Sequence, residues 1–447
     1  MTGPRISWLY NVIWRFGLPL IRRHLKKRAR AGKEEAGRLA ERYGQGYLTD
    51  RPQGRLIWLH AVSVGESVGA LNLCRALAQQ DADAHFIVSV NTRTAAQFIQ
   101  KEIDQSGDGL PLIQIYQPLD HPDFVTAFLR YWRPDLAIFM ESDFWFNLIT
   151  LTKAHHIPVI FASSQLSDKA YANWRRRNAF AAALFGAADL ILAVDQKQAD
   201  YFSTLSNRQN EVKDKHPEKT GPEKTGPEIL VAGSLKIDIR PPTPDDGFVA
   251  ALKQAADGRP LILAASTHDG EELLCLEAMA ALAHADVFMV FAPRHPVRGD
   301  AVMGLLAQGT RRFSAGVLPQ KGDSAYLVDA LGQMDSLFAA ADLVLMGGSF
   351  APLGGHNPLE PAAAGVPVLC GPHLFKNQAD YDALIAAGQC RKLDKTDRET
   401  LTEAIEHALS DSDFAQIAHE QGPAYLAEAC LRPQKAADYI FARMNKK

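Results

Sequence analysis

The sequence predicts an α/β protein made of two Rossmann-like, doubly wound domains that face a cleft. After residue 50, short apolar runs alternate with stretches of helical periodicity, which is typical of parallel sheets with helices on both faces. The alternation stops at a polar segment, 206–228, which repeats Glu-Lys-Thr-Gly-Pro at 218–222 and 223–227 and has too little apolar area to order itself. It then resumes, and each part has about 180–200 residues, the size of an ordinary domain.

The expected elements follow in chain order. In the first part we expect strands at 56–62, 85–90, 112–116, 136–140, 158–162 and 190–194, with helices such as 69–80 and 121–131 between them. In the second part we expect strands at 229–232, 261–265, 287–292, 325–327, 343–346 and 366–370, and helix over the last ~25 residues. The predicted division is a basic amphipathic segment (1–33), an N-terminal domain (34–205), a flexible linker (206–228), a C-terminal domain (229–424) and a C-terminal helix (425–447).

The composition indicates a folded protein of a reducing compartment. The 447 residues are 47% hydrophobic and 22% charged, which excludes a disordered or fibrous chain. The longest run without a charged residue has 17 residues and contains four Gly and two Pro, so a polytopic membrane protein is excluded. The five cysteines lie far apart without a CxxC pair, which excludes a disulfide framework and a Cys-based zinc site.

The first 50 residues carry a strong positive charge. They hold 11 Lys/Arg and 4 Asp/Glu, whereas the other 397 residues hold 37 and 47, so a basic segment precedes an acidic body. Such an asymmetry suggests an anionic partner near the N-terminus. Within the segment, apolar residues recur at the spacing of one helix face: Leu9, Val12, Ile13, Phe16 and Leu20. Three aromatic residues lie between them: Trp8, Tyr10 and Trp14. A basic cluster follows: Arg22, Arg23, Lys26, Lys27, Arg28 and Arg30.

We interpret this segment as an interfacial helix on an anionic membrane surface. Only 16 residues separate Arg5 from Arg22, and Arg15 interrupts them, whereas about 20 apolar residues are needed to span a bilayer. The alternatives are a basic helix packed on its own domain and a nucleic-acid-binding arm, and the Trp/Leu face argues against the second. A cleaved signal peptide is not expected, because the basic cluster follows the apolar part instead of preceding it.

Ligands of doubly wound sheets bind beyond the carboxyl ends of the strands, so candidate residues are sought directly after each strand. The first strand leads into HAVSVGES (60–67), where Glu66 follows a Gly turn at the start of a helix. The helix dipole favours an ionised carboxylate there, and a partly buried one could act as a general base. The fourth strand leads into ESDFWFN (141–147), where Glu141 and Asp143 stand beside three aromatic residues. Helix capping is the structural alternative for both motifs.

The second part contains more motifs of this kind. GSLK (233–236) offers a cation, STHDGEE (266–272) offers hydroxyls and amides for an anion, PRHPVR (293–298) offers Arg and His, and GGS (347–349) allows a backbone to approach a ligand. In GGHNPLEP (354–361), Asn357 and Glu360 lie one helical turn apart, and Glu360 is placed to accept hydrogen bonds from a ribose diol. Together these motifs predict a site for a nucleotide-activated sugar. No metal is predicted at His268, His295 or His356, because none has a second His at metal-binding spacing.

The full set of motifs resembles the 3-deoxy-D-manno-octulosonic acid (Kdo) transferases of lipid A biosynthesis. HAVSVGES, ESDFWFN, GSLK, STHDGEE, PRHPVR, GGS and GGHNPLEPAAAGVPVLCGP run in the order of that family from about residue 40 to 375, and the basic, apolar N-terminus resembles the family's anchor. The resemblance implies a GT-B glycosyltransferase fold with an N-terminal acceptor-binding domain and a C-terminal CMP-sugar-binding domain. It implies CMP-Kdo as donor, a lipid A precursor as acceptor, inversion of the anomeric centre, no metal or other cofactor, and a location on the cytoplasmic face of the inner membrane.

The resemblance also implies roles for single residues. Glu66 matches the general base, and Glu141 and Lys236 match residues that stabilise the transition state. The CMP-binding positions are Pro293, Arg294, Leu331, Gly332, Gln333, Asn357, Pro358, Leu359 and Glu360, and the supporting donor-site positions are Ser266, Thr267, His268, Gly348 and Ser349. The chain departs from the family pattern at Gln333, at Ser234, and within 143–146 and 163–167, and most of these departures concern the acceptor half or the hinge.

The expected chemistry fits these assignments. An acceptor hydroxyl has a high pKa, so a base such as Glu66 must remove its proton during attack on the anomeric carbon. Lys236 and Arg294 could stabilise the departing phosphate. Two other interpretations remain open: a GT-B transferase or epimerase that uses a UDP-sugar, and a catalytically inactive protein that binds sugar nucleotides at a membrane surface. The intact Glu66 and GGHNPLEP motifs argue against the inactive protein, and no nucleic acid is expected as a partner.

Overall fold

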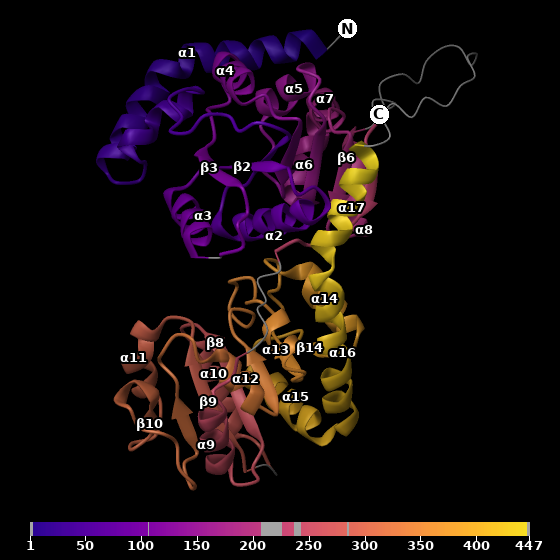
Figure 1. The fold of residues 1–447 in the computed structure, drawn as a ribbon. Helices are drawn as coiled ribbons and strands as arrows, with labels where there is room; N and C mark the ends of the chain where they lie inside the picture. Colours follow the sequence, from indigo (N-terminus) through magenta and orange to yellow (C-terminus); the bar gives the residue numbers. More distant parts are fainter. Residues whose placement is uncertain (1–2, 106, 207–225, 237–242, 284–285, 445–447) are drawn as a thin grey trace, which may run out of the picture. The chain divides into compact units, whose positions relative to one another are not determined.

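The computed structural model describes residues 3–105, 107–206, 226–236, 243–283 and 286–444. The chain divides into two compact units, the first formed by Met1–Asp238 with Leu431–Lys447 and the second by Ile239–Cys430. Figure 1 shows that each unit contains a sheet covered by helices, and each is described by itself below.

The first unit is built on a seven-stranded sheet with the order β3-β2-β1-β4-β5-β6-β7, and every neighbouring pair is parallel. Its strands are β1 (Leu56–His60), β2 (His85–Val90), β3 (Leu112–Tyr116), β4 (Leu136–Met140), β5 (Val159–Ser164), β6 (Leu190–Ala193) and β7 (Glu228–Val231). Its helices are α1 (Gly3–Arg30), η1 (Ala36–Tyr43), α2 (Val64–Gln80), α3 (Arg93–Gln105), α4 (Pro122–Trp132), α5 (Phe146–Ala154), α6 (Asp168–Arg176), α7 (Asn178–Phe185), α8 (Gln196–Ser206) and α17 (Arg432–Met444).

The second unit repeats this plan with the strand order β10-β11-β9-β8-β12-β13-β14, again with parallel neighbours. Its strands are β8 (Leu261–Thr267), β9 (Phe288–Pro293), β10 (Arg311–Arg312), β11 (Ala325–Leu327), β12 (Leu343–Met346), β13 (Val368–Cys370) and β14 (Cys390–Lys392). Its helices are α9 (Asp246–Ala256), α10 (Glu271–Ala280), η3 (Pro296–Arg298), α11 (Gly299–Met303), η4 (Phe313–Ala315), α12 (Met334–Ala340), α13 (Leu359–Ala363), α14 (Gln378–Ala386), α15 (Arg398–Ser410) and α16 (Ser412–Cys430).

These elements confirm the predicted fold class, and every strand expected from an apolar run is present within a few residues of its expected bounds. Parallel strands that helices cover on both faces are buried throughout, so their sequences are continuous apolar runs that are easy to recognise. The short strands β10 and β14 were not predicted, because Arg311–Arg312 and Cys390–Lys392 are mostly charged and give no such run.

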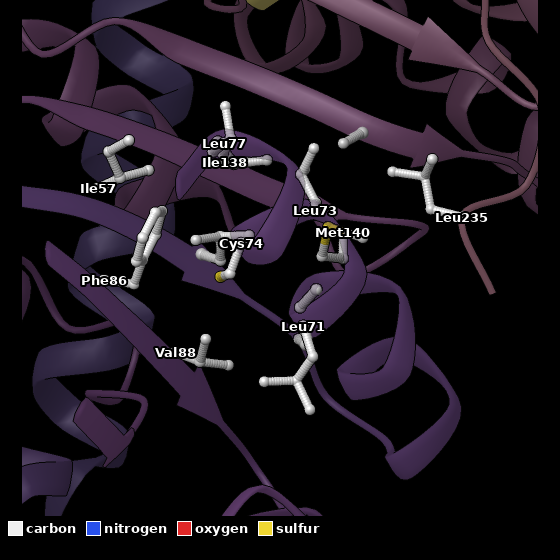
Figure 2. Packing of buried hydrophobic residues seen from close by; sticks show 14 of the residues in the cluster. Ile57, Leu71, Leu73, Cys74, Leu77, Phe86, Val88, Ile138, Met140 and Leu235 are labelled. Atoms are coloured by element: carbon white, nitrogen blue, oxygen red, sulfur yellow. The ribbon is translucent and has the colours of Figure 1, made fainter. Parts of the chain in front are cut away.

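The core of the first unit fixes the position of the residue that precedes Lys236. Leu73, Cys74 and Leu77 of α2 pack against Ile57 of β1 in a buried cluster that also contains Leu235 (Figure 2). Leu235 is fully buried, its N–H donates to Ser163 Oγ at 3.1 Å, and its C=O accepts from Asn72 Nδ2 at 3.3 Å. This anchoring leaves the next side chain, Lys236, at the edge of the unit's core.

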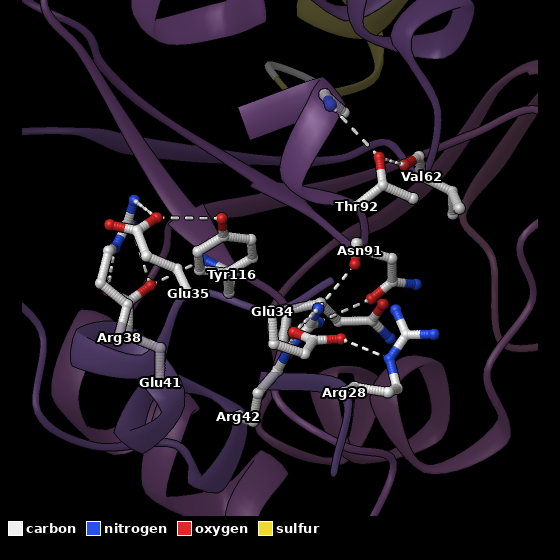
Figure 3. Close-up of polar contacts among 12 residues, drawn as sticks. Arg28, Glu34, Glu35, Arg38, Glu41, Arg42, Val62, Asn91, Thr92 and Tyr116 are labelled. Atoms are coloured by element: carbon white, nitrogen blue, oxygen red, sulfur yellow. Dashed lines mark hydrogen bonds and ion pairs between the residues drawn. The ribbon is translucent and has the colours of Figure 1, made fainter. Parts of the chain in front are cut away.

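A network of ion pairs holds η1 against the ends of β2 and β3 (Figure 3). The buried Arg42 guanidinium contacts Glu34 Oε2 at 3.0 Å and donates to the Asn91 C=O at 2.6 Å. Glu41 pairs with Arg38 at 2.6 Å and accepts from the Tyr116 N–H at 2.7 Å. Buried charges are stable only when they are paired and hydrogen-bonded, and each of these is.

The unit boundaries differ from the predicted ones at two places. β7 pairs with β6 in the first sheet, and Ile229 and Leu230 pack on the cores of the first unit, so the segment after 228 completes that unit before the second begins. The C-terminal part is not one helix from 425. α16 ends at Cys430 in the second unit, whereas α17 returns to the first unit, where Ala436, Ala437 and Ile440 join the buried cluster around α2. The predicted linker 206–228 lies outside the described residues, except for its two ends.

The N-terminal segment forms the helix α1, as expected, but two of its aromatic residues point inward. Tyr10 packs against Phe146 and Phe180 and donates from its hydroxyl to Asp120 Oδ2 at 2.7 Å, and Trp14 packs edge-on against Trp145. The interpretation of the whole segment as an interfacial helix is therefore corrected for Tyr10 and Trp14, because these two side chains attach the helix to its own unit. Four other large apolar side chains of α1 are exposed: Trp8, Ile13, Phe16 and Leu20. The Leu9 side chain lies outside the described part of the chain.

None of the described helices combines the length and the apolar character needed to cross a membrane.

Candidate active site

Glu66 lies in the first turn of α2, directly beyond the carboxyl end of β1. Ser63 caps this helix, since its Oγ accepts from the Glu66 N–H at 3.3 Å. The Glu66 carboxylate in turn accepts from the Val62 N–H at 2.8 Å and from the Ser63 hydroxyl at 3.2 Å. This reciprocal arrangement resembles a capping box, except that the carboxylate accepts the N–H of Val62 and not that of the N-cap residue Ser63. The structural alternative is therefore correct in that Glu66 does help to cap α2, and the capping contacts also fix the orientation of its carboxylate.

The surroundings of Glu66 perturb its ionisation. Burial raises the pKa of Glu66, because the charged form loses solvation; the Val62 N–H opposes this, and the neighbouring Glu141 carboxylate raises the pKa further. His60 and Lys236 have smaller opposing effects. A carboxylate with a raised pKa is a stronger proton acceptor than an exposed one, so this environment suits a general base.

Glu141 and Lys236 form an ion pair beside Glu66. Lys236 Nζ lies 2.7 Å from Glu141 Oε1, the Glu141 side chain is 6% exposed, and that of Lys236 is 38% exposed. The Lys236 side chain also passes over Gly65, where a Cβ would lie 3.4 Å from Lys236 Cε. Glu141 has a φ of 55°, a left-handed conformation that non-glycine residues adopt rarely. The first unit thus brings together Glu66, Glu141 and Lys236, which are far apart in the sequence.

A further set of hydrogen-bonded side chains lies next to this group, and no role was predicted for its members. His60 Nε2 lies 2.8 Å from Asp143 Oδ2, and the same carboxylate oxygen accepts from Trp145 Nε1 at 2.7 Å. On its other side, His60 Nδ1 lies 2.9 Å from Ser89 Oγ. Both His60 and Asp143 belong to the strand-end motifs. The sequence signal that could have identified this group is a His at the last position of a buried strand.

Three of the departures from the family pattern surround the ion pair. Ser163 Oγ accepts the Leu235 N–H, Gln165 Nε2 donates to Glu141 Oε2 at 3.3 Å, and Ser234 Oγ accepts the Lys236 N–H at 3.3 Å. The substituted side chains therefore hold Glu141 and the segment around Lys236 by hydrogen bonds.

The donor-site candidates of the second unit gather at the carboxyl ends of the three neighbouring strands β9, β8 and β12. Ser266 and Thr267 end β8 and Pro293 ends β9, whereas His268, Arg294, Gly348 and Ser349 lie just beyond the ends of β8, β9 and β12. The Arg294 N–H donates to the Thr267 C=O at 3.0 Å, which ties two of these ends together. At Gly347 a Cβ would lie 2.4 Å from the Ser266 carbonyl oxygen, so only glycine permits this close approach of the two loops.

The other candidates lie in two turns of the same unit. Asn357, Pro358, Leu359 and Glu360 form the entry to α13, where Asn357 Oδ1 accepts the Leu359 N–H and Asn357 Nδ2 lies 3.5 Å from Glu360 Oε1. Leu331, Gly332 and Gln333 form the exposed or half-exposed turn that begins α12, with Gly332 at a φ of 83°.

Glu271 organises the loops around the donor-site candidates, although it was not among the candidates. Its buried carboxylate accepts four backbone N–H groups, from His268 (2.8 Å), Gly348 (2.8 Å), Phe350 (3.1 Å) and Ala351 (3.0 Å). The adjacent Glu272 is also buried and pairs with Arg298 at 2.6 Å. Glu271 and Glu272 therefore shape the site, and both carboxylates are engaged in contacts within the unit.

No cluster of three or more His, Cys, Asp or Glu side chains with the arrangement of metal ligands occurs among the described residues.

The comparisons with known proteins agree with the motifs. Residues 37–218 match the family described as 3-deoxy-D-manno-octulosonic-acid transferase (kdotransferase). The chain is 31% identical to the 3-deoxy-D-manno-octulosonic acid transferase of Bordetella pertussis over 86% of this chain and 88% of that protein. It is 30% identical to that of Rickettsia bellii, over 77% and 78% of the two chains, and 28% identical to that of Haemophilus influenzae, over 90% of each.

Solved structures are similar in fold. A glycosyltransferase from Rickettsia africae matches with a TM-score of 0.56 at 13% identity, over 89% of this chain and all of that one. A UDP-GlcNAc 2-epimerase from Neisseria meningitidis matches with a TM-score of 0.53 at 13% identity, over 88% of this chain and all of that one. At such low identity these likenesses show the fold alone, which is of the GT-B type. The relatives of 30% and 31% identity establish that the chain belongs to the 3-deoxy-D-manno-octulosonic acid transferase family of glycosyltransferases.

Proposed function

We propose that this enzyme transfers Kdo from CMP-Kdo to a lipid A precursor with inversion at the anomeric carbon, and that Glu66 is its general base. The observation that carries the proposal is the group at the carboxyl end of the first sheet, where a buried, oriented carboxylate with a raised pKa lies beside the Glu141–Lys236 ion pair. The names of the relatives support Kdo as the transferred sugar.

In the proposed step, the Glu66 carboxylate takes the proton of an acceptor hydroxyl while the hydroxyl oxygen attacks the anomeric carbon of Kdo. The bond from that carbon to the phosphate oxygen of CMP breaks, and CMP leaves with the bonding electrons. The capping contacts from Val62 and Ser63 hold the carboxylate in one orientation, so little reorganisation is needed when the proton moves.

Lys236 supplies the positive charge of the first unit's site. Glu141 holds the ammonium group by the 2.7 Å ion pair, and the pairing leaves a third of the lysine side chain accessible to a ligand. A fixed cation of this kind stabilises negative charge that develops in a transition state. Glu141 keeps Lys236 in position, and Gln165 in turn holds the Glu141 carboxylate by a hydrogen bond.

The second unit is proposed to bind the donor. Arg294 is exposed and, within the described part of the chain, its side chain makes no hydrogen bond or ion pair, so it is available for the phosphate. Asn357 and Glu360 are proposed to bind the ribose hydroxyls. The proposal includes no metal and no other cofactor, because a monophosphate leaving group carries less charge than the diphosphates that divalent cations commonly chelate.

The exposed face of α1 is proposed to lie on the anionic surface of the inner membrane, on its cytoplasmic side. Ile13, Phe16 and Leu20 of this helix are 64%, 83% and 74% exposed. Beyond them, a surface hollow of about 820 Å³ is lined by Pro19, Leu20, Arg22, Arg23, His24, Lys26, Lys27 and Arg30. Apolar side chains next to a polybasic patch bind anionic lipid, each basic group contributing about 1 kcal/mol.

The test is a transfer assay with purified enzyme, CMP-Kdo and a tetraacylated lipid A precursor, followed by mass spectrometry of the lipid. The expected result is a lipid product heavier by one or more Kdo residues. A parallel reaction with UDP-GlcNAc in place of CMP-Kdo is expected to leave the lipid unchanged. Transfer or epimerisation with the UDP-sugar, and none with CMP-Kdo, would replace the proposal by the UDP-sugar alternative.

A further inference from the structure

Two histidines of the second unit face each other in the loops that follow β8 and β12. His268 Nε2 lies 2.9 Å from His356 Nε2, and the two rings are nearly parallel, at 10° with centroids 5.1 Å apart. At this distance one nitrogen donates a proton and the other accepts it, so only one of the two Nε2 atoms carries hydrogen. Both side chains are half-buried, which leaves them within reach of a ligand.

The pair is held by the backbone around it. The His268 N–H donates to Glu271 Oε2, and the His356 C=O accepts from the Tyr381 hydroxyl at 2.8 Å. Gly348 lies against the rings, since a Cβ there would come within 3.0 Å of His356 Cδ2, and the His356 N–H donates to the Gly347 C=O at 3.3 Å. Loops fixed in this way keep the two imidazoles in contact.

The charges that face the pair are mostly positive. Arg294, His295 and Lys376 act on His356 from the loops after β9 and β13, and His295 and Arg298 act on His268. Three acidic groups lie nearby. Glu271 accepts backbone N–H groups and opposes the lowering of the His268 pKa, whereas Glu272 and Asp269 pair with Arg298. Among the described residues, the side chains of Arg294 and Lys376 form no ion pair with a carboxylate, so two unpaired positive charges act on His356, as expected of an anion site.

Without a ligand, the surroundings of both imidazoles favour the neutral form. Burial, together with smaller effects of the nearby His268, Arg294, Lys376 and His295, lowers the pKa of His356 to about 4. Burial also lowers the pKa of His268. An anion bound between the rings and Arg294 would reverse the electrostatic part of this effect, because opposite charge favours the protonated imidazole.

We propose that the His268–His356 pair is part of the donor phosphate site and takes up one proton when a phosphate ester anion binds. The added proton breaks the Nε2–Nε2 hydrogen bond and gives two N–H donors that turn to the anion. This inference rests on the proposed donor site and adds to it a proton-linked affinity. By linkage, the affinity falls by up to about tenfold per pH unit between the pKa of the free pair and that of the bound pair, and is constant above both.

The probe is the methyl phosphodiester of CMP, which has the charge of a sugar-linked phosphate and, unlike CMP, no second phosphate ionisation near neutral pH. Its binding to the full-length enzyme is measured by calorimetry at pH 6 and pH 8 in buffers of different ionisation enthalpy, which gives the number of protons exchanged. For the unmodified enzyme at pH 6 we expect uptake of close to one proton and at least roughly fivefold tighter binding than at pH 8.

Variants identify the groups that carry the proton. In His356→Gln and, separately, His268→Gln, uptake should fall towards zero and the affinity should lose its dependence on pH. The control is His155→Gln, an exposed histidine of the first unit, which should behave as the unmodified enzyme does. Folding of each variant is checked by circular dichroism.

Binding by the unmodified enzyme with heats that are independent of the buffer would overturn the inference while leaving the donor site in place. Uptake of a full proton by both folded histidine variants would also overturn the inference and leave the donor site in place. Failure of the unmodified enzyme to bind the diester at either pH would instead overturn the proposed donor site itself.

Discussion

Replacement of Lys236 by Met tests whether the ion pair with Glu141 serves catalysis or only stability. Met keeps most of the volume of the lysine stem and removes the charge 2.7 Å from Glu141 Oε1. Two unit charges at that distance attract by about 1.5 kcal/mol in water and about 6 kcal/mol at an effective dielectric constant of 20. Since the Lys236 side chain is 38% exposed, and Gln165 still contacts the other Glu141 oxygen, we expect a stability loss near the lower value, about 1–2 kcal/mol.

The catalytic effect should be larger than the effect on stability. Loss of one preorganised group that stabilises a transition state lowers kcat by about a hundredfold to a thousandfold, which corresponds to about 2.7–4 kcal/mol. The assay compares kcat for Kdo transfer, the affinity for CMP and the melting temperature. For a unit of this size the stability loss corresponds to a decrease in Tm of roughly 2–8 °C.

The matched control is Lys197→Met, which removes another lysine–carboxylate pair of the first unit. Lys197 lies 2.8 Å from Asp168, and both side chains are largely exposed, so little change in stability and none in kcat is expected. A folded Lys236→Met enzyme with kcat within about threefold of the unmodified enzyme would refute the transition-state role, and the ion pair would then be structural.

Three further predictions concern the donor site, the N-terminal helix and pH. Glu360→Ala should weaken CMP binding roughly tenfold in calorimetry without loss of fold, because a ribose hydroxyl loses a charged acceptor; unchanged affinity would remove the assigned role. Replacement of Ile13, Phe16 and Leu20 by Ser should reduce binding to phosphatidylglycerol liposomes at least tenfold while CMP affinity stays the same, since these side chains point away from the unit; equal sedimentation with liposomes would contradict the membrane role. Burial raises the pKa of Asp120 to about 7, so the folded state keeps a proton that the unfolded chain releases near pH 4. The contribution of this carboxyl to the free energy of unfolding is therefore complete below pH 4 and is lost as the pH rises to 7. The Tm of Asp120→Asn relative to the unmodified protein should therefore rise between pH 5 and pH 8, and a constant difference would argue against ionisation of Asp120 in that range.

The sequence was sufficient to predict the sheets and the ends of strands where the candidate residues lie. Parallel strands buried on both faces have a local apolar signature, and the residues that follow them are fixed by chain order. The sequence is therefore sufficient to predict that Glu66, Glu141 and the segment around Lys236 are site positions, although their roles remain predictions.

Features that depend on distant packing had no such signature. The sequence around Ala436, Ala437 and Ile440 gives no signal that α17 packs on α2. The chain forms the whole second unit before α17 rejoins the first. The contact between His268 and His356 joins positions 88 residues apart, and the four amides bound by Glu271 come from two loops. In α1, both faces carry apolar and aromatic residues, so the sequence could not tell which face binds its own unit.

Deletion of α1 would for that reason be a poor test of membrane binding. It would remove Tyr10 and Trp14 and so expose Phe146, Trp145 and the buried Asp120, which packs next to the strand-end motif of Glu141. The serine variants of the exposed face leave these contacts intact and separate location from chemistry.

The most direct test of the central claim is the initial rate of Kdo transfer by Glu66→Gln at saturating CMP-Kdo and lipid acceptor. Gln keeps the volume of the side chain and can still accept the Val62 N–H, but it takes up no proton at neutral pH. If Glu66 is the general base, the rate should fall at least about a hundredfold, with CMP affinity and Tm nearly unchanged. A folded Glu66→Gln enzyme that transfers Kdo at a near-normal rate would contradict the mechanism and leave Glu66 as a helix cap.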